Sequence, residues 1–147
     1  NSIKIMKRRP EFTIIAGPNG ASKSRLGIFY STVKAFDGDL LAMFFETNFS
    51  TDLPVNLVQD FKDAGYKISL IFFGLSSKED SLSRVIQRYT MGGHNVNQDV
   101  IEYNFTEGIK RVRASLPLFE NILFIDGTSD FGDIVAIHIE KSLPFWQ

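Results

Sequence analysis

The chain has 147 residues, of which 44% are hydrophobic and 22% charged; this length supports one packed core, so we expect a single domain over residues 1–147. The formal net charge of -1 gives no general attraction to nucleic acid or anionic lipid, so neither is expected as a partner and an anionic ligand needs a local site. No apolar run reaches the roughly 18 residues of a membrane span, no signal peptide is recognisable and cysteine is absent, so we expect a cytoplasmic protein.

Six short apolar runs, most of them rich in β-branched and aromatic residues, are typical of strands. In chain order they are FTIIAG, VKAFDGD, AMFFETNF, KISLIFFGL, NILFIDGT and DIVAIHIE. Apolar residues at helical spacing predict helices over residues 22–30, 53–64, 77–89 and 98–114. The third of these helices opens with SSKE, which predicts a capping box with Ser76 as the cap. Because strands and helices alternate, the sequence predicts parallel β-α-β units.

The second and third predicted strands are unusually close along the chain. Only Leu40 and Leu41 separate FDGD from AMFFETNF, whereas a parallel crossover needs about a dozen residues or more. Three explanations are open for the short segment between Asp39 and Glu46. The two strands are not parallel neighbours, a crossover has been deleted, or the sequence omits a segment.

A glycine-rich segment, GPNGASKS, joins the first predicted strand to the first predicted helix. In this context successive backbone N–H groups form a concave anion site, and the helix N-terminus adds positive potential. In such a phosphate loop Lys23 would reach the terminal phosphates of a nucleotide, and the Ser24 hydroxyl would bind Mg²⁺. The candidate nucleotide-binding residues are Gly17, Pro18, Asn19, Gly20, Ala21, Ser22, Lys23 and Ser24.

Ser22 departs from the usual phosphate-loop pattern, which has a glycine immediately before the lysine. Its Cβ would crowd the β-phosphate or strain the loop, at a cost of about 1–3 kcal/mol if the glycine conformation is kept. The alternative interpretation of the segment is an ordinary glycine-rich strand-to-helix turn. A dinucleotide-binding loop is not supported, because the G-x-G-x-x-G pattern does not occur here.

Polar residues follow the second and third predicted strands, at the sheet edge where open α/β proteins bind ligands. Asp37 and Asp39 end the second strand, and a carboxylate there could accept a proton from an attacking hydroxyl. A simple Asp-Gly-Asp turn is the alternative. The candidate substrate-facing residues that end the next strand are Glu46, Thr47 and Asn48. A plain strand-to-loop exit would give the same pattern.

Two arginines, Arg84 and Arg88, are four residues apart on the third predicted helix and therefore share a face. The glycine-rich sequence MGGHNV follows them. Arg88 could stabilise charge on a transferred phosphoryl group, as an arginine of the same chain does in other phosphoryl-transfer enzymes. A solvated helix face is the alternative.

The segments AGPNGASKS, FDGD, FETNF and R-x-x-x-R-x-x-x-GGHNV, in this order, resemble the zeta-toxin-like P-loop kinases. The resemblance runs from about Glu11 to Thr128. It implies an α/β fold of the three-layer P-loop kinase type, with a mostly parallel sheet of about five or six strands and helices on both faces. It further implies transfer of a phosphoryl group from ATP, with Mg²⁺, to a hydroxyl of a small molecule, which in the toxins is UDP-N-acetylglucosamine. By the same analogy an antitoxin protein is a partner.

The resemblance also implies roles for individual residues. Lys23 and Ser24 match the phosphate-binding and metal-binding residues of the family, Asp39 matches the proposed catalytic base, and Arg88 matches an arginine near the γ-phosphate. The residues that match the family's substrate segment are Glu46, Thr47 and Asn48.

Three departures from the family pattern favour a second interpretation. Ser22 replaces a glycine, the segment after Asp39 is short, and a second arginine expected after GGHNV has no match, since Glu102, Tyr103 and Asn104 fill that region. The second interpretation is a catalytically impaired module that binds a nucleotide or a partner on the same scaffold. Asp39 and Glu46, present together with Lys23, favour the kinase.

Overall fold

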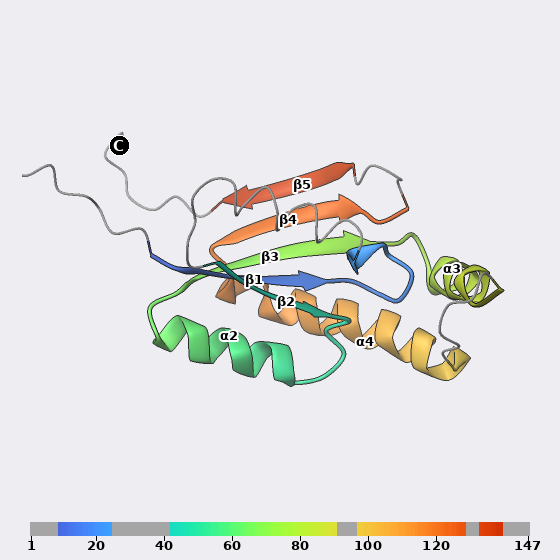
Figure 1. The fold of residues 1–147 in the computed structure, drawn as a ribbon, viewed down its shortest axis with the longest axis horizontal. Helices are drawn as coiled ribbons and strands as arrows, with labels where there is room; N and C mark the ends of the chain where they lie inside the picture. Colours follow the sequence, from blue (N-terminus) through green and yellow to red (C-terminus); the bar gives the residue numbers. More distant parts are fainter. Residues whose placement is uncertain (1–8, 25–41, 91–96, 129–132, 140–147) are drawn as a thin grey trace, which may run out of the picture.

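The computed structural model describes residues 9–24, 42–90, 97–128 and 133–139 (Figure 1). The elements in chain order are β1 (Glu11–Ala16), β2 (Ala42–Thr47), α2 (Leu53–Asp63), β3 (Lys67–Gly74), α3 (Lys78–Thr90), α4 (Gln98–Ser115), the 3-10 turn η1 (Leu116–Leu118), β4 (Asn121–Asp126) and β5 (Ile134–Ile139). The three helices expected after residue 50 are confirmed to within one residue at either end. The helix expected over 22–30, beyond its first residues, and the strand VKAFDGD lie outside the described residues.

The five strands form one sheet in the order β2-β1-β3-β4-β5. The first four are parallel, and β5 pairs with β4 in the antiparallel direction. The predicted α/β fold with a mostly parallel sheet is therefore confirmed. The parallel strands all end at the same edge of the sheet, and β1, which precedes the glycine-rich segment, lies between two neighbours there (Figure 1).

Alternating side chains of the strands build a core on each face of the sheet. On one face β1, β3 and β4 bury Phe12, Ile68 and Ile122 against α2 and α4, which lie side by side below the sheet in Figure 1. The ring of Phe12 stacks on that of Phe61 of α2, with 4.0 Å between centroids. The apolar residues on the other face are Ile15, Ala21, Ile71, Phe73 and Ile125. Any helices on that second face lie outside the described residues.

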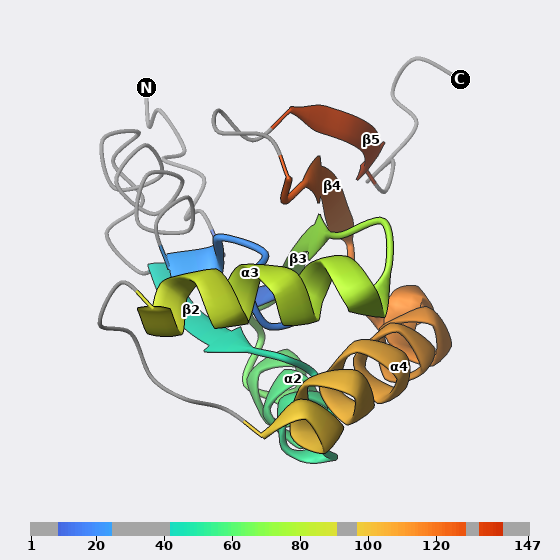
Figure 2. The same cartoon turned by 90° about the vertical axis from the view of Figure 1, so that its right-hand side faces the viewer.

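Helix α3 lies across the edge where the parallel strands end, as Figure 2 shows. It begins at Lys78, and the Ser77 hydroxyl accepts a 3.1 Å hydrogen bond from the backbone N–H of Asp80. The prediction of Ser76 as the cap was thus wrong by one residue, because the serines are adjacent and the packing of α3 decides which one faces the first turn. Within the described residues, no helix combines the length and apolar character needed to cross a bilayer.

The chain leaves β2 through an unusual backbone conformation. Phe49 has a φ of 61° and a fully buried side chain, and its N–H donates to the Thr47 hydroxyl at 2.9 Å. A left-handed conformation is costly for a bulky residue. The neighbouring carbonyl of Asn48 lies against Gly108 of α4, so closely that a Cβ on this glycine would collide with it. Packing in the core and against α4 therefore fixes the direction of the chain after β2.

Candidate functional site

The glycine-rich segment Gly17–Ser24 continues β1 at the edge where the parallel strands end. Its first residue still belongs to the sheet, since the Gly17 N–H donates to the Thr47 carbonyl at 3.3 Å. A Cβ on Gly17 would collide with the Phe73 carbonyl, and one on Gly20, whose φ is 82°, would lie 2.8 Å from the Arg84 Cβ. Both glycines are therefore required by close approach of the loop to β3 and α3.

Ser22 adopts the left-handed conformation that a glycine would take, with a φ of 63°. Two effects were predicted for Ser22, crowding of the β-phosphate and strain of the loop backbone. The structure shows the backbone strain. The backbone N–H groups of Gly20 and Ser22 have no hydrogen-bond partner within the described part of the chain. Unpaired N–H groups in a loop of this shape are the donors with which a protein binds an anion.

The ammonium group of Lys23 is buried inside its own loop. The residue is 8% exposed, and its Nζ donates to the carbonyls of Gly17 at 2.6 Å and Pro18 at 2.8 Å and to the Asn48 Oδ1 at 2.9 Å. Burial lowers the pKa of Lys23 from 10.5 to about 8, the carboxylate of Glu46 opposes this shift and the guanidinium of Arg88 adds to it. Lys23 thus remains cationic at neutral pH, with its three N–H groups bonded to the protein.

Two of the predicted residues bond to the end of the loop, and a third carries a charge that acts on Lys23. Glu46 and Asn48 come from the end of β2, and Arg88 comes from the last turn of α3. The Ser24 hydroxyl donates to Glu46 Oε1 at 2.9 Å, and Arg88 is close enough to influence the Lys23 pKa. Thr47, also predicted, bonds with its hydroxyl only to the backbone of Phe49 in the described structure. Asp39 and the GGHNV segment lie outside the described residues.

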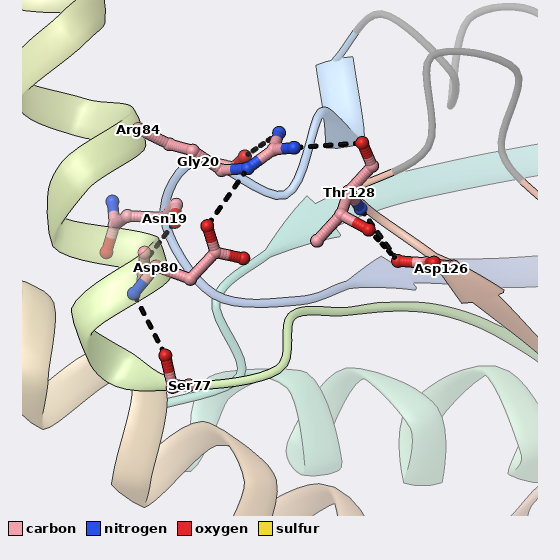
Figure 3. Close-up of polar contacts among 8 residues, drawn as sticks. Asn19, Gly20, Ser77, Asp80, Arg84, Asp126 and Thr128 are labelled. Carbon is pink, nitrogen blue, oxygen red and sulfur yellow. Dashed lines mark hydrogen bonds and ion pairs between the residues drawn. The ribbon is translucent and has the colours of Figure 1, made fainter.

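Arg84 has a different environment from Arg88, although both lie on α3. Its guanidinium donates to the Gly20 carbonyl at 3.2 Å and to the Thr128 carbonyl at 2.9 Å, and pairs with Asp80 at 3.6 Å (Figure 3). It therefore joins the loop to the chain that follows β4. The spacing of the two arginines in the sequence placed them on one face of the helix, but it could not show that Arg84 bonds to the backbone of the loop.

The turn after β4 also packs on the loop. Asp126 accepts from the N–H of Thr128 at 2.9 Å and from its hydroxyl at 2.5 Å (Figure 3). These two bonds, with a smaller contribution from Arg84, hold the pKa of Asp126 below its usual value. A Cβ on Gly127 would lie 2.8 Å from the Ala21 carbonyl, so the turn and the loop are in direct contact.

Two further polar residues, missed by sequence analysis, hold Asn19 in the loop. Ser81 of α3 donates to the Asn19 carbonyl, and the buried Asn104 of α4 donates through Nδ2 to Asn19 Oδ1 at 2.8 Å. Asn104 also accepts from the Ser50 hydroxyl at 2.8 Å. Asn104 lies in the region where the resemblance places a second arginine, and here it positions the loop. No signal in a single sequence distinguishes such a buried asparagine from an exposed one.

The oxygen donors at this site fit a hydrated magnesium ion. Ser24 and Glu46 supply a hydroxyl and a carboxylate, and Mg²⁺ is commonly held by one or two such groups together with phosphate oxygens and water. Among the residues that the structure describes, no group of three or more histidine, cysteine, aspartate or glutamate side chains forms a closed metal site. The phosphates of a ligand would therefore have to complete the coordination.

Comparison with known sequences gives a distant relative. No family model matches the chain. An uncharacterised protein of Haemophilus influenzae is 24% identical over 85 residues, which are 58% of this chain and 58% of that protein. The match thus spans little more than half of the relative's length.

Comparison with solved structures identifies the fold. A chain from the PezAT chromosomal toxin–antitoxin system of Streptococcus pneumoniae superposes with a TM-score of 0.63 at 15% identity, covering 88% of this chain and 71% of that one. The AvrRxo1-ORF1:-ORF2 complex solved with ATP gives 0.60 at 16% identity, covering 90% of this chain and 59% of the other. The protein therefore has the zeta-toxin-like P-loop fold that the sequence predicts, and it spans about 60% of the AvrRxo1 chain.

Proposed function

We propose that the protein is an ATP- and Mg²⁺-dependent kinase that transfers the γ-phosphoryl group to a hydroxyl of a nucleotide sugar or a similar metabolite. The observation that carries the proposal is the loop at the end of β1, with unpaired N–H groups beside the buried cation of Lys23. Crystals of the similarly folded AvrRxo1-ORF1:-ORF2 complex with ATP support the choice of nucleotide.

In this proposal each charged group near the loop has a distinct task. The Lys23 ammonium exchanges its bonds to the Gly17 and Pro18 carbonyls for bonds to phosphate oxygens, and Arg88 stabilises charge on the transferred group. Asp39 accepts the proton of the attacking hydroxyl, as the resemblance implies. Ser24 holds Mg²⁺, which when bound neutralises phosphate charge.

The alternative is a module that binds a nucleotide or a protein partner without turnover. The left-handed Ser22 supports it, because strain in the loop disfavours the shape that phosphate binding needs. An antitoxin is the partner that this alternative and the kinase proposal share, supported by the likeness to a chain of the PezAT toxin–antitoxin system. Incubation with labelled ATP and a panel of nucleotide sugars separates the two functions, since only a kinase labels an acceptor.

Ser22→Gly is expected to tighten ATP binding about three- to tenfold, because glycine removes roughly 1 kcal/mol of left-handed strain and the Cβ next to the phosphates. Calorimetric titration with ATP and Mg²⁺ measures the affinity. Ser22→Ala is the matched control, since it keeps the Cβ and the strain and should bind as the original protein does. Equal affinities of the glycine and alanine variants would contradict the role given to the backbone.

ATP affinity is expected to fall with rising pH above about 8, by roughly tenfold per pH unit, because the free Lys23 ammonium loses its proton there and only the cation binds phosphate. Below that pH the group is already charged and contributes no further change. Calorimetry between pH 7.5 and 9.5 tests this expectation. Lys23→Arg, whose guanidinium stays charged, should bind more weakly but with a flat profile. A flat profile in the unmodified protein would show that protonation of Lys23 does not control ATP affinity.

A further inference from the structure

The side-chain amide of Asn19 is bonded at its oxygen end only. Its Oδ1 accepts from the Nδ2 of the buried Asn104 at 2.8 Å, and the Asn104 Oδ1 accepts from the Ser50 hydroxyl at 2.8 Å. Among the residues that the structure describes, no group accepts a hydrogen bond from the Asn19 Nδ2. An amide nitrogen carries two N–H donors, so the loop presents two neutral donors on a half-buried side chain.

Asn19 lies at the end of the loop that holds the Lys23 ammonium. The two residues that precede it, Gly17 and Pro18, accept from this ammonium through their carbonyls at 2.6 and 2.8 Å. In a phosphate loop the lysine reaches the β- and γ-phosphates, whereas backbone N–H groups surround the α- and β-phosphates. A side chain beside the lysine end of the loop is therefore on the side of the terminal phosphate.

From this arrangement we propose that the Asn19 Nδ2 donates a hydrogen bond to the terminal phosphate of the nucleotide, and that Asn104 is a positioning residue that holds the Asn19 amide in the required orientation. The inference rests on the proposed function, because ATP supplies the terminal phosphate. It makes Asn19 a residue that distinguishes a nucleoside triphosphate from a diphosphate.

Both the backbone and the side chain of Asn19 are held by neighbouring helices. Ser81 of α3 donates to the Asn19 carbonyl, and Asn104 of α4 donates to its side chain. Donors that are fixed before the ligand arrives stabilise its charge without a cost of reorganisation. A neutral amide also suits this place, because a further cation would be repelled by the buried ammonium of Lys23.

The test of Asn19 compares two nucleotides in Asn19→Ala. Calorimetry measures the affinities of Mg²⁺–ADP and of the Mg²⁺ complex of a non-hydrolysable ATP analogue. We expect the affinity for the ATP analogue to fall about tenfold or more, and that for ADP to change by less than about twofold, because only the terminal phosphate loses a donor. Retained ADP binding shows that the loop of the variant is still folded.

Asn56→Ala is the matched control, because Asn56 is exposed on α2 and the same side chain is removed. Both of its affinities should equal those of the unmodified protein. An unchanged ratio of the two affinities in Asn19→Ala, whether both stay the same or both fall equally, would overturn the role given to Asn19 and leave the proposed function intact. Failure of the unmodified protein to bind the ATP analogue would overturn the proposed function and this inference together.

The role of Asn104 is tested with Asn104→Leu, alone and combined with Asn19→Ala. Leucine has a similar volume but cannot donate to the Asn19 amide, so the single variant should bind the ATP analogue more weakly and ADP normally. If Asn104 acts through Asn19, the double variant should show the same ratio of affinities as Asn19→Ala alone. Independent, additive effects of the two substitutions on this ratio would contradict the positioning role.

Discussion

Replacement of Lys23 by alanine is expected to abolish measurable ATP binding, a loss of at least about 100-fold, and to remove phosphoryl transfer with it. The ammonium is the buried cation of the loop, and its bonds to Gly17, Pro18 and Asn48 hold it inside the loop. Calorimetric titration with ATP and Mg²⁺ measures the loss.

The same substitution also removes the donor for three oxygen atoms, so some loss of stability accompanies it, about 1–3 kcal/mol. Thermal denaturation of the variant without ligand separates this effect from binding. Lys78→Ala, at the exposed start of α3, is the control for loss of a positive charge alone and should bind ATP normally. Equal ATP affinity of Lys23→Ala and the unmodified protein would exclude the loop as a phosphate site.

Gly108→Ala is expected to destabilise the protein by about 1–3 kcal/mol, although the same change in an exposed helix would stabilise it by about 1 kcal/mol. The added Cβ would collide with the Asn48 carbonyl, so either α4 or the end of β2 has to move. Movement of Asn48 pulls its Oδ1 away from the Lys23 ammonium, so ATP affinity should fall as well. Chemical denaturation and calorimetry measure the two effects.

Gly65→Ala is the control for a glycine without a close neighbour. Gly65 has a φ of 89° but no atom within 4 Å of an added Cβ, so the substitution costs only backbone strain, about 1–2 kcal/mol, and should leave ATP binding unchanged. A stabilised Gly108→Ala variant with normal ATP affinity would show that a Cβ at residue 108 fits beside the Asn48 carbonyl without moving it.

Most of the fold could be predicted because its signals are local. Short apolar runs indicated the strands, helical spacing located α2, α3 and α4, and the loop after β1 was recognisable from its glycines, lysine and serine. The one-residue error at the start of α3 arose because Ser76 and Ser77 are equally good caps in sequence.

The directions of side chains at the site could not be predicted, because contacts between distant segments set them. Sequence reasoning grouped Glu46 and Asn48 as residues facing a substrate, but it could not show that they also bond to Ser24 and Lys23 of the loop, because this depends on the packing of β2 beside β1. The hydrogen bonds of Arg84 and Asn104 to the loop depend on how α3 and α4 pack at the sheet edge. The spacing of apolar residues in the sequence does not predict this packing. Asp39 stays a prediction, since it lies outside the described residues.

Residue 49 is subject to two opposed requirements. A glycine there would relax the left-handed backbone but would leave a large void in the core, whereas any other bulky side chain would fill the space and keep the strain. No substitution of Phe49 therefore removes the backbone strain and also keeps the core filled. Its two neighbours, Asn48 and Ser50, bond to the Lys23 ammonium and to Asn104, respectively. A site adapted to a new ligand would therefore have to keep Phe49 and change the side chains on either side of it.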